Sequence, residues 1–249
     1  MIPKIIHFCW LSGNPYPPKI EQCILSWKEK LPDYEIILWD TKRFDINSVQ
    51  WVKEAFDKKK YAFAADYIRF YALFNHGGIY LDSDVEVLKS FNDLLDCRSF
   101  IGFEYSGVLE AAIVGAEKKC CWIGNCLDWY NNRSFYDKDG KTKEIVLPMI
   151  ISHIYEEVFD CELIDKDEVY NFNKHFLYPY KYFSPKDCYT NQIIQSDLSV
   201  AIHHFETAWQ KKTLSIKIKK VIHIILIKTL GKKVHDLLLY KIRSKRLEG

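Results

Sequence analysis

The chain has 249 residues, of which 48% are hydrophobic and 15% aromatic, so it is not a largely disordered protein, and its length suits one large α/β domain with or without an appendage. The net charge is +2, but residues 211–249 hold 12 of the 35 Lys and Arg residues and only two acidic residues. The tail is therefore +10 and residues 1–210 are −8, a split typical of an acidic body with a basic arm for an anionic surface.

The sequence gives no sign of secretion or of a membrane span. Its first residues, MIPKIIHFCWLSG, lack the basic segment and the long apolar run of a signal peptide, and no run reaches the roughly 18 apolar residues of a spanning helix. The eight cysteines include no Cys-x-x-Cys pair. We therefore expect all eight to be free thiols in a reducing compartment.

The first third of the chain predicts a βαβ unit. Residues 4–10 are β-branched and aromatic and predict a buried strand, and residues 19–30 have apolar residues at helical spacing. A second strand is predicted at residues 35–39. Strand, helix and strand at this spacing favour a parallel sheet, so we predict an α/β fold with a mostly parallel sheet flanked by helices.

The strongest predicted helix of the chain covers residues 58–78, as part of a helical hairpin, and ends at Gly77 and Gly78. The remaining elements are predicted, in chain order, as strands or extended segments at 79–81, 85–91, 99–104 and 111–116, helices at 119–132 and 145–159, and extended segments at 168–179 and 200–205.

The basic tail predicts two further helices, at 215–230 and 232–246, separated by Gly231. We expect a domain at 1–210 and a basic amphipathic helical extension at 211–249. Lys and Arg among apolar residues favour binding to an anionic membrane face. The alternatives are helices that pack on the body with solvated cations, and an arm for nucleic acid; we expect the membrane and no nucleic-acid partner.

Two carboxylates follow the predicted strand in the segment HGGIYLDSDVEVL, residues 76–88. Asp82 and Asp84 are two residues apart, so in extended chain both side chains point to the same side, just beyond the carboxyl end of the strand. Ligands bind there in open α/β sheets. Two adjacent carboxylates suit Mg²⁺ or Mn²⁺ held jointly with a substrate diphosphate, although an Asp-rich surface turn would give the same pattern.

The preceding helix carries a second charged pair, Asp66 and Arg69, which are three residues apart and share a helix face. Such a pair can be an exposed ion pair with little effect on stability. Here small alanines and apolar residues surround it, so we expect Arg69 to bind hydroxyl or phosphate groups and Asp66 to bind sugar hydroxyls.

Four segments in order resemble glycosyltransferase family 32, whose members have the GT-A fold and act in capsule and O-antigen synthesis, and which is related to the glucosylating domains of large clostridial toxins. The similarity covers roughly residues 1–210. It rests on IPKIIHFCWLSG (2–13), PDYEIILWD (32–40), the central helix with D-x-D (61–88) and AIHHFETAW (201–209).

The resemblance implies a binding site for a UDP-sugar. Trp10 would stack on the uracil ring, Asp66 and Arg69 would bind ribose and donor-sugar hydroxyls, and Tyr80 would line the donor pocket. Asp82 would contact the ribose or the metal through water.

The resemblance also implies a metal centre with Mn²⁺ or Mg²⁺ as the cofactor. Asp84 would ligate the metal directly, with Asp82 beside it, and His204 would complete the metal shell. Thr207 and Trp209 would contact the diphosphate. The residues expected to carry catalysis are Asp84, Asp82 and Arg69.

The family implies transfer with retention of the anomeric configuration. The metal would act as a Lewis acid on the diphosphate leaving group. The sequence offers no second carboxylate pair at nucleophile spacing, so we expect front-face attack. Glu104 and Glu110 follow or begin strand-like segments and are candidates for contact with the acceptor.

The resulting functional prediction is a metal-dependent retaining hexosyltransferase that moves a hexose or N-acetylhexosamine from a UDP-sugar to a lipid-linked saccharide in surface polysaccharide synthesis. We expect it in the cytoplasm, at the inner face of a bacterial cytoplasmic membrane. The alternatives are a catalytically silent protein that binds sugar nucleotides, and a D-x-D phosphatase, whose Asp-x-Asp follows a strand earlier in the chain.

Overall fold

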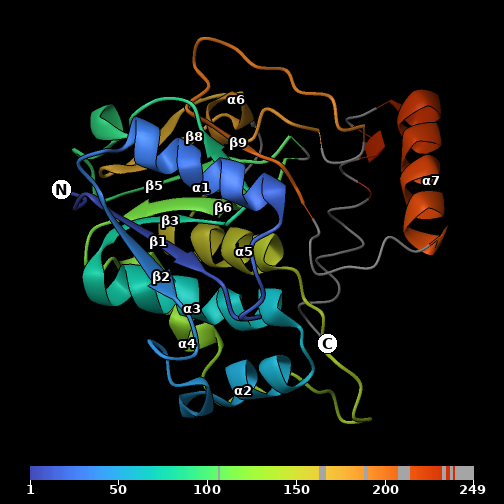
Figure 1. Cartoon of the computed structure of the whole chain (residues 1–249). Helices are drawn as coiled ribbons and strands as arrows, with labels where there is room; N and C mark the ends of the chain where they lie inside the picture. The colour runs from blue at the N-terminus through green and yellow to red at the C-terminus, as the bar shows by residue number, and fades with distance from the viewer. Residues whose placement is uncertain are drawn as a thin grey trace.

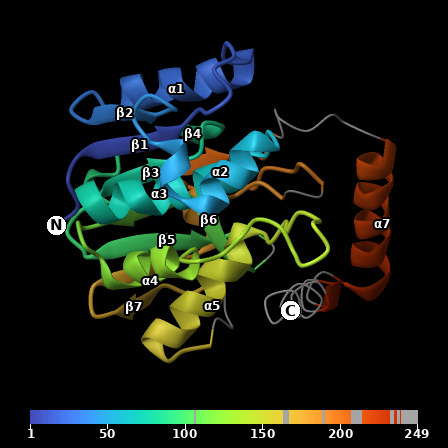
Figure 2. The same cartoon turned by 90° about the horizontal axis from the view of Figure 1, so that it is seen from below.

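The computed structural model describes residues 1–105, 107–162, 167–187, 190–206, 214–231, 234–235 and 238, with the backbone alone for 214–220. A seven-stranded sheet lies at the centre, in the order β2-β1-β3-β6-β5-β8-β7, with helices on both faces (Figures 1 and 2). Its strands are β1 Ile5–Cys9, β2 Glu35–Trp39, β3 Gly78–Leu81, β5 Ser99–Phe103, β6 Leu109–Ala116, β7 Tyr170–Phe172 and β8 His175–Tyr178.

The predicted α/β fold with a mostly parallel sheet is confirmed. Within the described residues, β1, β2, β3, β5 and β8 run in one direction, and β6 and β7 run against them. The helices are α1 Pro18–Lys30, α2 Gln50–Asp57, α3 Tyr61–His76, α4 Cys121–Trp129, α5 Leu147–Phe159, α6 Tyr180–Phe183 and α7 Leu214–Leu230, with short 3-10 turns at Ile46–Ser48 and Asn92–Leu94.

Two hydrophobic cores lie on opposite faces of the sheet, because successive side chains of a strand point to opposite sides. Ile79 and Leu81 of β3 pack into the core under α1, together with Trp27. Tyr80, between them, packs into the other core, which α2, α3, α4 and α5 cover. The sheet is therefore a buried layer, and only its strand ends are free to carry a site.

His7 joins three elements on the face of the sheet that α2, α3, α4 and α5 cover. Its Nε2–H donates to the Gly77 carbonyl at 2.8 Å, and its Nδ1 accepts from the indole N–H of Trp39 at 3.1 Å. A carbonyl only accepts and an indole only donates, so the ring is the neutral tautomer with the proton on Nε2. This single side chain ties β1 to β2 and to the end of α3.

The glycine pair that ends α3 is required by its geometry. Gly77 has a φ of 69° and Gly78 a φ of 112°, and a Cβ at Gly78 would lie 2.7 Å from the Ile5 carbonyl oxygen. The predicted helix at 58–78 is therefore real but shorter, since Lys59 at a φ of 57° separates it from α2. The tight turn leads the chain directly into β3 and on to Asp82.

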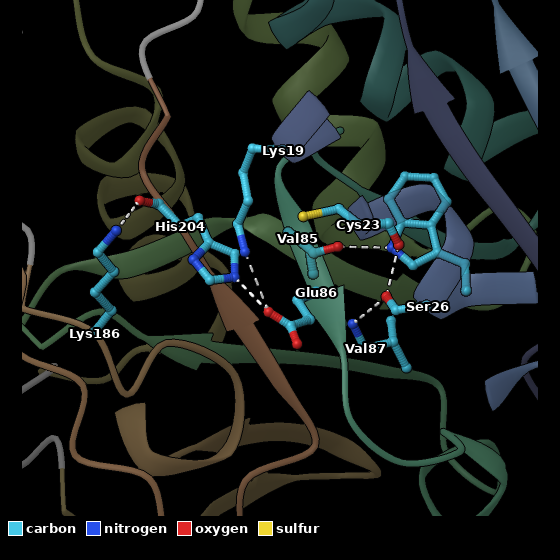
Figure 3. A network of polar contacts seen from close by, with 9 residues as sticks. Lys19, Cys23, Ser26, Val85, Glu86, Val87, Lys186 and His204 are labelled. Atoms are coloured by element: carbon cyan, nitrogen blue, oxygen red, sulfur yellow. Dashed lines mark hydrogen bonds and ion pairs between the residues drawn. The ribbon is translucent and has the colours of Figure 1, made fainter. Parts of the chain in front are cut away.

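The segment expected to be extended from 85 to 91 forms only a short strand, β4 Val85–Val87. It pairs antiparallel with β9 Ala201–His203 in a separate two-stranded sheet, with Val85 opposite His203. This two-stranded β4–β9 ribbon packs on α1. The Trp27 indole donates to the Val85 carbonyl at 2.7 Å, and the Val87 N–H donates to the Ser26 hydroxyl at 2.9 Å (Figure 3).

The tail is helical at α7, which contains the whole of the expected 215–230 helix and lies to one side of the body in both views (Figures 1 and 2). Most of the expected 232–246 helix lies outside the described residues, and the division at 210 stays a prediction. In the described part of the chain no helix is both long and apolar enough to span a bilayer. The seven described cysteines are free, and Cys188 lies outside the described residues.

Candidate active site

The two aspartates of the D-x-D segment lie where β3 leaves the sheet. The Asp82 N–H donates to the Ala112 carbonyl of β6 at 2.8 Å, and the Val85 N–H closes a turn on the Asp82 carbonyl at 3.0 Å. This turn redirects the chain into β4. Asp82 is partly buried, and Asp84 is only 7% exposed. The site is thus at the carboxyl end of β3, as the sequence predicted.

His203 of β9 completes a three-residue cluster with the aspartates. Its Nε2 lies 3.5 Å from Asp84 Oδ2, and one ligand atom from each of Asp82, Asp84 and His203 lies within 4.8 Å of the others. The Val85–His203 pairing of the ribbon explains this proximity. The histidine of the cluster comes from a segment more than a hundred residues away from the D-x-D pair.

The structure differs here from the sequence prediction, which gave His204 this place. His204 points to the other side of the ribbon, where its Nε2 lies 2.7 Å from Glu86 Oε2 (Figure 3). Lys19 of α1 lies 3.5 Å from the same carboxylate, and Lys186 donates to the His204 carbonyl. Adjacent residues of a strand face opposite sides, so only one of the two histidines can face the aspartates.

Asp84 is held by the backbone as well as by His203. Its Oδ2 accepts the Glu206 N–H at 2.7 Å, and its carbonyl accepts the His204 N–H at 3.1 Å. Burial raises the pKa of a carboxyl group, but the charge and hydrogen bond of His203 and the Glu206 N–H outweigh it, so the Asp84 pKa lies below its ordinary value. Asp84 is therefore ionised and ready to bind a cation at neutral pH.

Asp82 has the opposite shift. Burial raises its pKa, and the like charges of Asp84 and Glu110 add to the effect, against the charges of Arg69 and His203. The carboxylates crowd one another, and a cation between them would remove the repulsion.

Arg69 of α3 lies between Asp66 of the same helix and Asp82 of the D-x-D segment. Its Nη2 lies 3.0 Å from Asp66 and 3.3 Å from Asp82, and its Nη1 donates to the Ala111 carbonyl. Arg69 is 4% exposed, and the central carbon of its guanidinium lies 4.6 Å from the centre of the Tyr80 ring. The pair is therefore a buried network beside the D-x-D segment, as expected, and not an exposed ion pair.

Asp66 and Asp82 share the single charge of Arg69, which leaves the Asp66 carboxyl only partly compensated. The pKa of Asp66 is raised to about 7, mainly by burial and also by the charge of Asp82, while Arg69 opposes both. One Asp66 oxygen bonds to Arg69. Tyr80 is 1% exposed with its ring against Arg69, so it supports the guanidinium instead of lining an open pocket.

Trp10 lies just past the end of β1, at the same edge of the sheet as Asp82, because β1 and β3 are parallel. Its indole N–H donates to the Asn14 carbonyl at 2.7 Å, and its ring meets Tyr16 edge to face at 4.9 Å. The indole N–H is thus already hydrogen-bonded, so a ligand could contact Trp10 only through its partly exposed ring. Thr207 and Trp209 lie outside the described residues.

Glu110 lies beside the cluster of Asp82, Asp84 and His203, although the sequence suggested contact with an acceptor. It is 1% exposed, and its Oε2 lies 3.3 Å from His203 Nδ1. Glu104 is partly buried in the segment after β5. One sequence signal could have indicated the Glu110 position: a single acid in the apolar run LEAAIVGA requires a buried partner.

The cluster suits a divalent cation. Two carboxylates and an imidazole are the oxygen and nitrogen ligands that Mn²⁺ accepts, and the carboxylate pair alone suits Mg²⁺. The proximity of ligand atoms from three residues, two of them carboxylates, supports this chemistry. Asp82, Asp84 and His203 would hold the ion.

Comparison with known proteins points to the same region. Residues 17–101 match the family described as "Glycosyltransferase sugar-binding region containing DXD motif". The chain is similar to inositol phosphoceramide mannosyltransferase 3 of Schizosaccharomyces pombe, 36% identical over 104 residues, which are 40% of this chain and 29% of that protein. It is also similar to the mannosyl phosphorylinositol ceramide synthase SUR1 of Saccharomyces cerevisiae, 31% identical over 112 residues, 41% of this chain and 27% of that one.

The chain therefore spans less than a third of the length of these two relatives. Among solved structures it is similar to the PaToxG glycosyltransferase, with a TM-score of 0.52 and 20% identity, over 64% of this chain and 70% of that one. This likeness concerns the fold. The chain thus combines a GT-A type α/β fold with a D-x-D region of the glycosyltransferase kind, and the D-x-D aspartates lie in the buried charged cluster.

Proposed function

We propose that the protein is a metal-dependent glycosyltransferase that uses a UDP-sugar and transfers a hexose or N-acetylhexosamine with retention of configuration. The observation that supports this most is the cluster of Asp82, Asp84 and His203 at the end of β3. Two of its members belong to the region that matches the sugar-binding family. Mn²⁺ or Mg²⁺ is the proposed cofactor.

The chain's own residues would bind and orient the donor. Trp10 presents its ring to the base, and Arg69 and Asp66 bind hydroxyls of the ribose and the sugar from below. The bound metal would supply charge neutralisation of the diphosphate leaving group. Thr207 and Trp209 remain proposed diphosphate contacts, and the proposed place of His204 in the metal shell passes to His203.

Front-face attack is the mechanism that the site supports. Each buried carboxylate near the D-x-D pair already has a side-chain partner: Asp66 faces Arg69, and Glu110 and Asp84 face His203. A carboxylate nucleophile would have to leave that partner unpaired in the buried site. The acceptor hydroxyl would instead pass its proton to an oxygen of the leaving diphosphate.

The proposed acceptor is a lipid-linked saccharide of surface polysaccharide synthesis, reached at an anionic membrane face through residues 211–246. Helix α7 supports this, since Val221, Ile222 and Ile225 are 54%, 49% and 53% exposed. The relatives are named for mannose transfer to an inositol phosphoceramide, also a membrane lipid. We place the protein at the inner face of a bacterial cytoplasmic membrane.

The test is release of nucleoside diphosphate from a panel of sugar nucleotides, mannose donors included, with Mn²⁺ and with EDTA. Wild type is compared with Asp84→Asn and with Asp57→Asn, an exposed control whose Lys53 partner lies outside the site. We expect metal-dependent turnover of one donor that Asp84→Asn lowers at least 100-fold and Asp57→Asn leaves unchanged.

Other outcomes separate the alternatives. UDP binding that requires metal, without turnover of any donor, would favour the silent sugar-nucleotide-binding protein. Phosphate release from a phosphomonoester would favour the phosphatase. A protein that binds no sugar nucleotide with or without metal would refute the proposed donor site.

A further inference from the structure

Glu110 is a buried carboxylate near the start of the apolar strand β6. It is 1% exposed, and its neighbours in β6, Leu109 and Ala111, are buried too. An ionised carboxylate in such surroundings is strongly unfavourable without hydrogen-bonding partners or an opposite charge. The position therefore needs a reason other than packing.

Both oxygens of Glu110 have partners. Oε1 accepts the Ala112 N–H at 2.9 Å, a bond within its own strand that fixes the orientation of the carboxylate. Oε2 then faces Nδ1 of His203 at 3.3 Å. The strand thus aims one carboxylate oxygen at one nitrogen of the histidine in the cluster.

The two nitrogens of His203 face different groups. Nδ1 faces Glu110, whereas Nε2 faces Asp84 at 3.5 Å and lies in the group of ligand atoms with Asp82. Glu110 would accept the Nδ1–H, so that a cation binding at Nε2 displaces the proton from that nitrogen and uses its lone pair. Metal-binding histidines are commonly held in this way, by a carboxylate at the nitrogen away from the metal.

The surroundings hold this arrangement in place. Phe205 lies against the His203 ring with a centroid distance of 4.0 Å and an interplanar angle of 36°. The same short stretch of β6 also binds the Asp82 N–H through Ala112 and Arg69 through Ala111. One rigid strand therefore positions a carboxylate for the histidine, the backbone of the first aspartate, and the arginine.

We propose that Glu110 is a positioning residue that holds His203 with Nδ1–H toward its carboxylate and Nε2 toward the metal bound by Asp82 and Asp84. The inference rests on the proposed metal-dependent function. Glu110 does not touch substrate or metal, and its effect on the reaction passes through His203.

The test measures Mn²⁺ binding by the loss of the free-ion EPR signal, using the full chain and Mn²⁺ alone. The variants are Glu110→Gln, His203→Ala and the double variant, with Glu117→Gln as the matched control. Glu117 lies just beyond the other end of β6 and pairs with Arg98, outside the site.

We expect Glu110→Gln to weaken Mn²⁺ binding 10- to 100-fold, roughly the effect of losing such an outer carboxylate, and Glu117→Gln to leave it unchanged. Asp82 and Asp84 remain in His203→Ala, so weak binding can still be measured there. In that background Glu110→Gln should change the affinity by less than about twofold, because its effect requires the imidazole.

An undiminished affinity in Glu110→Gln, or an equal loss with and without His203, would overturn the inference and leave the proposed function intact. Wild type that binds no Mn²⁺ would overturn the metal site itself. If Glu110→Gln does not fold, ¹⁵N NMR of the His203 ring in wild type with Zn²⁺, a diamagnetic ion that imidazole binds, decides. A proton on Nδ1 supports the proposal, and a proton on Nε2 refutes it.

Discussion

Acidification should destabilise the protein through His7. The side chain is fully buried and uses both ring nitrogens in the neutral form, one to donate to Gly77 and one to accept from Trp39. Protonation would place a second N–H against the Trp39 indole N–H. The pKa of His7 is lowered from 6.5 to about 4, mainly by burial; the charges of His76 and Arg43 act in the same direction, and the bond to Gly77 opposes them.

The magnitude follows from this shift. Between pH 6.5 and 4 the unfolded chain carries the proton on His7 and the folded protein does not, so stability falls as the pH falls through this window. With one pKa unit equal to about 1.4 kcal/mol, the loss is about 2 kcal/mol at pH 5 and about 3 kcal/mol at pH 4. Below pH 4 both states bind the proton and the loss no longer grows.

Urea unfolding of wild type, His7→Gln and His153→Gln at several pH values measures this effect. His153 is 51% exposed on α5 and serves as the matched control. The stability advantage of wild type over His7→Gln should shrink by about 3 kcal/mol from pH 7 to pH 4, whereas the difference from His153→Gln stays nearly constant. A constant difference between wild type and His7→Gln would show that the His7 ring titrates normally in the fold.

Two further predictions concern packing and the tail. Gly115→Ala should lower the free energy of unfolding, measured in urea, by about 1–3 kcal/mol. The added Cβ would lie 2.2 Å from the Phe100 ring, against which Phe91 and Phe183 stack. A loss below about 0.5 kcal/mol would mean that the Phe100 ring moves freely. In a flotation assay, phosphatidylglycerol vesicles should carry the full chain but not Ile225→Asp. Leu25→Asp, at an exposed position of α1, is the control and should float like the wild type. Equal flotation of both variants would contradict membrane binding through α7.

The elements governed by local sequence were predictable. The pattern of α3, the glycine pair that ends it and the carboxylates after β3 all follow from neighbouring residues, and the structure places them as expected. The pairing of β4 with β9 does not follow from local sequence. It decides which of His203 and His204 faces Asp84, because a shift of one residue in a strand exchanges its two faces.

Glu110 illustrates a second limit. A strand-like segment at 111–116 was predicted, but the role of Glu110, which directly precedes it, depends on His203, far along the chain. The family match ends at residue 101, before Glu110 and His203. The residues that local sequence reveals, Asp82 and Asp84, thus lie inside the region that matches the family, whereas Glu110 and His203 are brought to them by the tertiary fold.

The β4–β9 ribbon has a consequence for how the protein becomes active during synthesis. Glu86 and His204, which clamp the ribbon, are 118 residues apart in the chain. Contacts of such long range are costly in loop entropy and form late. A nascent chain that has emerged only to β6 carries both aspartates but no histidine beside them. The cluster of Asp82, Asp84 and His203 is therefore assembled late in folding, so a chain that ends before β9 holds only its two aspartates.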